Sequence, residues 1–479
     1  MHARIVLLSV ASLIGAAAAG SAQQTASTPP NGGAGARVAG TWDGVLHAGV
    51  TSMRLELAVR DSAGALVGTM RSLDQGGAQA PATVSTSGDS LSVAIPQWHI
   101  TYAGAVMASG DSVHGTFNQN GVSMPLVFAR VATPLPAGRP QDPKPPFPYH
   151  AADVTIASVA GVSLAGTVII PEGRGPFPAV VFVTGSGPQD RDEALMGHRP
   201  FLVIADYLAR HGIASLRYDD RGVGKSTGSF DRSTSADFAM DAEAAFRYLT
   251  HVQGVAPNRV GILGHSEGGL IGPMVAARNR DVAFLVLMSG PGIPGDSLLL
   301  LQGKLIAIAG GVSPAAADSA TASRRQLLEA VAKAHDSADA VTRLAAAKQA
   351  VLAGVPADRR AAAATQIDQA MPQLLSPWFQ YFLRYDPRPA LRQVRVPVLA
   401  LGGSLDLQVP AKENLPAIDS ALRAAGNPND RVMELPRLNH LFQTATTGSP
   451  AEYATIDETV APVALDAMAS WISAHFGAP

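Results

Sequence analysis

The sequence of 479 residues contains no cysteine, which excludes a disulfide framework, a thiol nucleophile and a cysteine-ligated metal site. Its formal net charge is only −2, so no basic surplus is available to hold nucleic acid or an anionic membrane by charge alone. Beyond the N-terminal segment, Gly, Pro or charged residues interrupt every apolar run, and we expect no membrane span in the mature chain. We expect neither a metal nor another cofactor, and the sequence leaves the oligomeric state open.

The N-terminus has the parts of a secretory signal peptide. Arg4 supplies the charge, an apolar run follows, and small residues offer a cleavage site ending at Ala22. A membrane helix needs about 20 apolar residues, more than this run provides, although an uncleaved anchor is the alternative. We therefore expect residues 1–22 to be removed and the mature chain to be periplasmic or secreted. Residues 23–39, rich in small and polar residues, predict a flexible tether.

Residues 40–130 predict a small all-β domain. In "MRLELAVR" (53–60) apolar and polar residues alternate, which is the period of a half-buried strand. Turn-forming stretches at 61–64 and 87–90 separate such runs, so we expect short antiparallel strands in a sandwich or barrel. Three aromatic residues either fill the core, which is the favoured interpretation, or line a ligand pocket: Trp42, Trp98 and Tyr102.

The proline-rich segment 131–149 predicts a semi-rigid linker, after which buried strands alternate with amphipathic helices through residues 150–479. The strands, such as "AVVFVTG" and "VPVLALGG", are almost continuously apolar. This alternation predicts an α/β fold with a mostly parallel, doubly wound sheet. Residues 295–390 are Ala-rich, helical in pattern and far too long for a simple connection. We predict that they form a helical cap over the carboxyl edge of the sheet; the alternative is an excursion away from the site.

The stretch "RGVGKSTG" at 221–228 imitates two catalytic motifs. A phosphate-binding loop needs a glycine five residues before Gly224, where this chain has Asp219, whose carboxylate would repel phosphate. No helix is predicted directly after Ser226, so the strand–turn–helix order of a nucleophile elbow is missing as well. We expect Asp219, Arg221 and Ser226 to order a glycine-rich loop beside the site.

A second match, "GHSEGG" at 264–269, has the full context of a nucleophile elbow. The run "RVGIL" predicts the strand, Gly264 and Gly268 flank Ser266, and "EGGLIGPMVAAR" predicts the helix. The glycines allow backbone segments to approach the turn, and the helix N-terminus stabilises negative charge. Ser266 is therefore the predicted nucleophile, the alternative being a structural serine in a tight turn.

A serine hydroxyl is a weak nucleophile that needs a base, and the base needs an orienting acid. Where a nucleophile elbow is used, the acid follows the serine in the chain and the histidine comes last. Asp406 follows the predicted strand 396–403, and His440 lies on a loop after a later strand. Alone, each would read as a helix cap or a core residue, but their order and positions predict a triad with Ser266. Other candidates fall on predicted helices or in a turn: Asp419, Asp430 and His475.

The negative oxygen that forms during acyl transfer needs backbone donors. The amide of Glu267, directly after the nucleophile, is one predicted donor. The other is expected from the junction "VVFVTGSGPQDRD", where the amide of Ser186 is favoured over that of Gly185. A flexible turn is the competing interpretation of this loop. Its charged run at 190–192 is either an ion-pair cluster that orders the loop or a solvated surface.

Four stretches together resemble the α/β-hydrolase superfamily, in particular its bacterial carboxylesterase branch: "YDDRGVGKS", "LGHSEGG", "LALGGSLDLQVP" and "LNHLFQ". That branch lies near the serine aminopeptidase-like and monoacylglycerol-lipase-like hydrolases. The loop "GSGPQDRDE" is similar to that of exported EstD-type esterases, in which a β-rich N-terminal module is also familiar. The resemblance implies the α/β-hydrolase fold, cofactor-free hydrolysis of short-chain esters, and the triad Ser266, Asp406 and His440. Many relatives have His-Gly where this chain has Thr184-Gly185, which bears on the second oxyanion donor.

The sequence thus predicts an exported serine carboxylesterase that acts on small-molecule esters through an acyl-enzyme on Ser266. One alternative is a serine peptidase or amidase with the same triad, in which Glu267 or Asp190 anchors a peptide terminus. The other is an envelope protein that binds carbohydrate or lipid and keeps a vestigial hydrolase domain.

Overall fold

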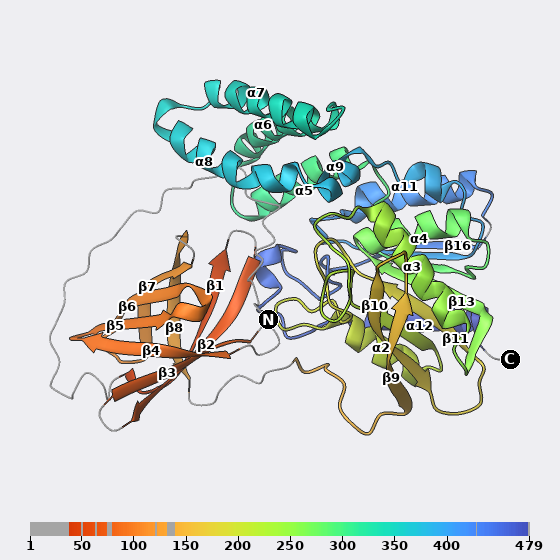
Figure 1. The fold of residues 1–479 in the computed structure, drawn as a ribbon, viewed down its shortest axis with the longest axis horizontal. Helices are drawn as coiled ribbons and strands as arrows, with labels where there is room; N and C mark the ends of the chain where they lie inside the picture. Colours follow the sequence, from red (N-terminus) through yellow and green to blue (C-terminus); the bar gives the residue numbers. More distant parts are fainter. Residues whose placement is uncertain are drawn as a thin grey trace.

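The computed structural model describes residues 38–48, 51–62, 65–73, 79–119, 122–131, 139–427 and 429–477. The expected signal peptide, most of the expected tether and residues 132–138 of the linker lie outside these ranges. A β-rich part and a larger α/β part follow one another along the chain (Figure 1). Within these ranges, no helix has the length and apolar character needed to cross a membrane.

The β-rich part is a closed antiparallel barrel in which each strand pairs with the next and the last pairs with the first. Of the two predicted architectures, a sandwich or a barrel, the structure has the barrel. Its strands are β1 (Gly40–Ala48), β2 (Thr51–Ser62), β3 (Ala65–Ser72), β4 (Gln79–Ser87), β5 (Ser90–Ile95), β6 (Ile100–Val106), β7 (Ser112–Gln119) and β8 (Val122–Val131), with the short helix η1 (Pro96–Trp98) before β6.

Aromatic side chains fill the barrel core. Trp42 is fully buried, and its indole Nε1 donates a hydrogen bond to the Val38 carbonyl oxygen at 2.9 Å. The Tyr102 side chain is also buried, and its hydroxyl lies 3.0 Å from the Val113 carbonyl oxygen. Trp98, in η1, is only half-buried and packs against the same core. The favoured interpretation of Trp42 and Tyr102 as core residues is confirmed.

The α/β part is built on a second sheet with the strand order β16-β15-β14-β13-β11-β12-β10-β9. Strands β11 to β16 run parallel, whereas β10 pairs antiparallel with both β9 and β12. The predicted fold class, a mostly parallel α/β-hydrolase sheet behind an all-β domain, is confirmed. The strands are β9 (Tyr149–Ala157), β10 (Ser163–Pro171), β11 (Phe177–Val183), β12 (Ala214–Tyr218), β13 (Val255–His265), β14 (Leu285–Met288), β15 (Val398–Gly403) and β16 (Asp430–Leu435).

Helices cover both faces of this sheet, which explains why its central strands are apolar at successive positions. Along β11, Val181 and Val183 belong to the core under helices α3, α4 and α11, whereas Val180 and Phe182 belong to the core under α2 and α12. These helices are α2 (Pro200–Arg210), α3 (Ser235–Thr250), α4 (Glu267–Arg278), α11 (Ala411–Ala424) and α12 (Pro462–Phe476).

The predicted helical insertion lies between β14 and β15. Its first and fifth helices, α5 and α9, contribute side chains to the cavity described below, whereas α6, α7 and α8 extend away from the sheet (Figure 1). The insertion is therefore a cap at the site as well as an excursion beyond it. Its helices are α5 (Gly295–Ala309), α6 (Pro314–Ala332), α7 (Ser337–Ala353), α8 (Ala357–Leu374), α9 (Pro377–Arg384) and α10 (Arg388–Leu391).

Replacing Trp42 tests the barrel core. Trp42→Ala should lower the free energy of unfolding of the barrel by about 3–5 kcal/mol, because a cavity replaces the indole ring. Trp42→Phe, which keeps most of the buried volume, should cost less. Denaturant unfolding followed by circular dichroism measures both variants. An alanine variant that unfolds at the wild-type denaturant concentration would contradict a tightly packed core.

Candidate active site

Ser266 occupies the turn between β13 and α4, at the carboxyl edge of the sheet. Its φ of 52° and ψ of −115° lie in a region that residues with a side chain rarely adopt. A Cβ atom at Gly264 would lie 2.1 Å from the Gly268 carbonyl oxygen, and one at Gly268 would lie 2.0 Å from the Val183 carbonyl oxygen. Only glycine fits at these two positions, so the motif is required by the close approach of three backbone segments.

Ser226, in the competing motif, has a structural role. Its hydroxyl donates to the Asp219 carbonyl oxygen at 2.7 Å and accepts a hydrogen bond from the Ala165 amide at 2.9 Å. The residue is buried, and the next helix, α3, begins only at Ser235. Arg221 binds Asp241 on that helix, with its Nε 2.6 Å from the carboxylate. This loop is therefore ordered as expected and lacks the geometry of an elbow.

Asp406 and His440 come together from the loops that follow β15 and β16. His440 Nδ1 lies 2.9 Å from Asp406 Oδ2, and both side chains are buried. The other carboxylate oxygen of Asp406 accepts the backbone amides of Gln408 and Val409, each at 2.8 Å. The carboxylate is thus fixed from two sides and can hold the His440 ring in one orientation.

Ser266 and His440 line the same cavity, which has a volume of about 150 Å³. Among the described residues, the Ser266 hydroxyl donates no hydrogen bond to His440, a contact that often tightens only when substrate binds. The other candidates are elsewhere: Asp419 lies on α11, Asp430 begins β16 and His475 lies on α12. The walls of the cavity are mainly apolar and include Met196, Leu298, Leu299, Ile306, Trp378, Phe382, Val409 and Leu441.

The two favoured oxyanion donors, Ser186 and Glu267, both line the cavity. Glu267 is the first residue of α4, so its amide has no carbonyl partner one turn earlier in the helix. The structure contradicts Gly185 as the alternative oxyanion donor, because the Gly185 amide already donates to Glu193 Oε1 at 2.7 Å. The Thr184 hydroxyl donates a hydrogen bond to Asp220 at 2.8 Å and anchors the same loop.

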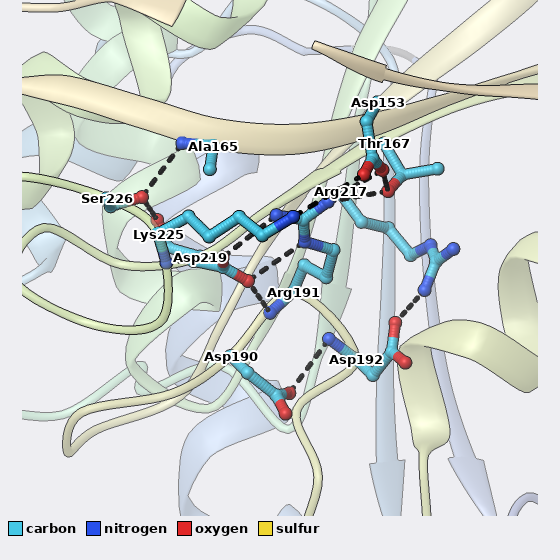
Figure 2. Close-up of polar contacts among 10 residues, drawn as sticks. All are labelled: Asp153, Ala165, Thr167, Asp190, Arg191, Asp192, Arg217, Asp219, Lys225 and Ser226. Carbon is cyan, nitrogen blue, oxygen red and sulfur yellow. Dashed lines mark hydrogen bonds and ion pairs between the residues drawn. The ribbon is translucent and has the colours of Figure 1, made fainter. Parts of the chain in front are cut away.

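Two residues of the charged run after Ser186, Arg191 and Asp192, belong to an ion-pair network, whereas Asp190 is exposed (Figure 2). Arg191 binds Asp219 with two nitrogens, each 2.9 Å from a carboxylate oxygen, and reaches Asp153 at 3.1 Å. Burial opposes ionisation of Asp219, but hydrogen bonds from Arg191 outweigh this effect and lower its pKa. The network joins the Ser186 loop to the loop of Ser226, because Asp219 takes part in both.

The side chain of Asp190 is used within the same loop. Its Oδ1 accepts the backbone amides of Asp192 and Ala194, each at 3.0 Å. The carboxylate of Asp192 in turn pairs with Arg217 on β12 (Figure 2). Asp190 therefore stabilises the turn of the loop from within.

The side chain of Glu267 connects the nucleophile elbow to the cap. It is buried and accepts hydrogen bonds from the Ser235 hydroxyl at 2.6 Å and from the Trp378 indole at 2.8 and 2.9 Å. Burial raises the pKa of Glu267 to about 7. Trp378 belongs to α9 and lines the cavity, so this carboxylate fixes one wall of the site.

Two buried residues at the site had no signal in the sequence. Glu193 and His265 form a hydrogen-bonded pair, with 2.9 Å between Glu193 Oε1 and His265 Nδ1. A glutamate at the end of a charged loop and a histidine before the elbow serine look like many others, and only the fold brings them together. The described residues contain no cluster of His, Cys, Asp or Glu side chains suited to hold a metal ion.

The sheet order, the elbow and the cap define an α/β-hydrolase, and the chain is a serine hydrolase. A family model described as X-Pro dipeptidyl-peptidase (S15 family) matches residues 160–434, more than half of the chain. The chain therefore belongs to the X-Pro dipeptidyl-peptidase (S15) family.

Three proteins are similar to parts of this chain. Esterase EstD of Thermotoga maritima is 26% identical over 331 residues, which cover 68% of this chain and 68% of that protein. Bile acid-CoA:amino acid N-acyltransferase of Mus musculus is 27% identical over 157 residues, 33% of this chain and 34% of the transferase. Among solved structures, the esterase Pf2001 of Pyrococcus furiosus aligns with a TM-score of 0.39 and 16% identity, covering 60% of this chain and 83% of that one.

The raised pKa of Glu267 predicts a pH-dependent stability. Since its pKa of about 7 exceeds the ordinary value of 4.5, its contribution to stability is complete below pH 4.5 and is lost as pH rises through 7. Glutamine does not ionise, so Glu267→Gln should not lose this contribution. Between pH 4.5 and pH 8, the unfolding free energy of the variant should therefore rise by up to about 3 kcal/mol relative to that of wild type.

Unfolding free energies of the α/β part at both pH values measure this gain. Glu172→Gln, at an exposed position after β10, is the matched control and should follow the wild-type curve. If the unfolding free energies of wild type and Glu267→Gln changed equally with pH, the raised pKa of Glu267 would be contradicted.

Proposed function

We propose that the chain is an exported carboxylesterase that hydrolyses short-chain esters, with Ser266, His440 and Asp406 as its catalytic triad. The observation that carries the proposal is the cavity that Ser266 and His440 share, with Asp406 hydrogen-bonded to the far side of the His440 ring. Ser186 and Glu267 line the same cavity, where their amides would receive the oxyanion.

In the proposed reaction, Ser266 Oγ attacks the ester carbonyl carbon while His440 Nε2 accepts the hydroxyl proton. Asp406 accepts a hydrogen bond from the Nδ1–H group, which fixes the tautomer of His440 and stabilises the imidazolium. The tetrahedral intermediate collapses as the bond to the alcohol oxygen breaks, and His440 gives its proton to that oxygen. Water, deprotonated by His440, then attacks the acyl carbon; the bond from that carbon to Ser266 Oγ breaks, Oγ takes the proton from His440, and the carboxylic acid leaves.

The preference for short acyl chains follows from the size and walls of the site. A cavity of about 150 Å³ with mainly apolar lining suits a small hydrophobic acyl group. The similarity to esterase EstD over 68% of both chains also favours an ester substrate.

Peptide hydrolysis is the second candidate, because the family takes its name from X-Pro dipeptidyl-peptidases. Such an enzyme would need a carboxylate for the amino terminus of the peptide. Glu267 and Asp190 already accept hydrogen bonds from groups of the protein itself. An ester, which has no ammonium group to bind, fits this site better. A vestigial domain is disfavoured because the three residues of the proposed triad are all present.

Covalent labelling by a fluorophosphonate tests the nucleophile. Ser266→Ala should abolish labelling and lower kcat by about 10⁴-fold or more, because it removes the proposed nucleophile at the elbow. Ser226→Ala is the matched control: it should be labelled like wild type but lose about 1–3 kcal/mol of stability, because it leaves buried backbone groups unpaired. Loss of labelling in Ser226→Ala with labelling kept in Ser266→Ala would reverse the assignment.

A comparison of two chromogenic substrates tests the reaction class. We expect p-nitrophenyl butyrate to have a higher kcat/KM than alanyl-prolyl p-nitroanilide, because the carboxylates of Glu267 and Asp190 already accept hydrogen bonds from the protein. Steady-state rates at pH 7.5 on the same preparation give both values. A higher kcat/KM for the anilide would identify the chain as a peptidase.

A further inference from the structure

A second acid–histidine pair lies directly behind the proposed triad. His265 is the last residue of β13 and is buried next to Ser266. Its Nδ1 is 2.9 Å from Glu193 Oε1, and its Nε2 is 2.9 Å from the backbone carbonyl oxygen of His440. The same Glu193 oxygen accepts the Gly185 amide at 2.7 Å.

These contacts join the loops that carry Gly185, His265 and His440. Gly185 directly precedes Ser186, the proposed oxyanion donor, and His265 directly precedes Ser266. The third contact is made to the backbone of His440 itself. Each hydrogen bond of the pair therefore acts on a residue of the proposed machinery or on its immediate neighbour.

The chemistry of the acceptors fixes the number of protons in the pair. A carbonyl oxygen can only accept, so His265 Nε2 must carry a hydrogen to bond to His440. The 2.9 Å contact between Nδ1 and Glu193 needs a second hydrogen, so the pair holds one proton more than a neutral imidazole and a carboxylate.

The surroundings of His265 agree with this count. Its ring faces Glu193, the His440 ring at 4.8 Å and the Phe442 ring at 6.5 Å, with Asp406 behind His440. Burial alone would lower the pKa of His265, but the charge and hydrogen bond of Glu193 outweigh it and raise the pKa.

Glu193 is held in position by the loop that carries it. Its backbone has a φ of 52°, and its amide donates to the Asp190 carbonyl oxygen at 2.9 Å. The preceding residues, Arg191 and Asp192, pair with Asp219 and Arg217 (Figure 2). The ion-pair network therefore directs the Glu193 side chain toward His265.

We propose that Glu193 and His265 act together as positioning residues, holding the Ser186 amide and the His440 backbone in register with Ser266 for acyl transfer. The proposal rests on the proposed function. Replacing Glu193 or His265 should therefore lower kcat and leave KM almost unchanged. Misplaced oxyanion donors and a misplaced base weaken the stabilisation of the transition state and not the binding of the substrate.

The test uses Glu193→Gln, His265→Gln and the double variant with p-nitrophenyl butyrate. Glutamine at position 193 keeps an acceptor for the Gly185 amide but removes the charge that keeps both ring nitrogens of His265 protonated. Each single variant should lower kcat by about 10- to 100-fold, with KM changed by less than about threefold. Because the residues act as a unit, the double variant should be no slower than the slower single variant.

The matched controls are Glu172→Gln and His150→Gln, which replace exposed side chains and should keep the wild-type kcat. Fluorophosphonate labelling of Ser266 should slow in the pair variants by the same factor as kcat, since labelling uses the same geometry.

Unchanged kcat, a change confined to KM or melting temperature, or additive losses in the double variant would each overturn the proposal. A wild type that neither turns over the ester nor labels at Ser266 would overturn the proposed function, and this proposal with it. If a variant fails to fold, neutron diffraction of the wild type decides, because it locates ring hydrogens directly. A deuteron on His265 Nε2 and another between Nδ1 and Glu193 would support the pair; a bare Nε2 would refute it.

Discussion

The close approach of backbone segments at the nucleophile elbow is the constraint on which the rest of the site depends. Gly264, Gly268 and the end of β11 at Val183 are so close that a Cβ atom at either glycine would overlap a carbonyl oxygen. This packing keeps Ser266 at a positive φ and places its side chain in the cavity. It also starts α4 at Glu267, which leaves the amide of that residue available to an oxyanion.

Two buried acids then link the elbow to its surroundings. The side chain of Glu267 reaches Ser235 on α3 and Trp378 on the cap, so the wall of the cavity is tied to the residue after the nucleophile. The side chain of Glu193 reaches His265, the residue before the nucleophile. Both neighbours of Ser266 are therefore held by buried carboxylates, and Glu193 does so through Oε1 alone, since its Oε2 has no hydrogen-bond partner among the described residues.

The sequence predicted those features that have a local pattern. Apolar runs predicted the central strands, and the glycine spacing predicted the elbow. The order along the chain predicted Asp406 and His440, and in the fold His440 Nδ1 lies 2.9 Å from Asp406 Oδ2. The sequence did not resolve the antiparallel pair β9 and β10: most residues of β9 are exposed, and Gly166 and Thr167 interrupt the apolar residues of β10, although most of that strand is buried. It favoured Ser186 over Gly185 as an oxyanion donor but did not show the reason, which is that Glu193 Oε1 accepts the Gly185 amide and also contacts His265, 72 positions further along the chain. Contacts of this kind arise from tertiary packing alone.

The most direct test of the account is to identify the acylated residue. A brief reaction of the wild-type chain with p-nitrophenyl butyrate, quenched in acid before steady state and digested, can be read by tandem mass spectrometry. We expect a butyryl group on Ser266, formed together with a burst of p-nitrophenol. A butyryl group on Ser226, or rapid turnover with no acylated serine, would contradict it.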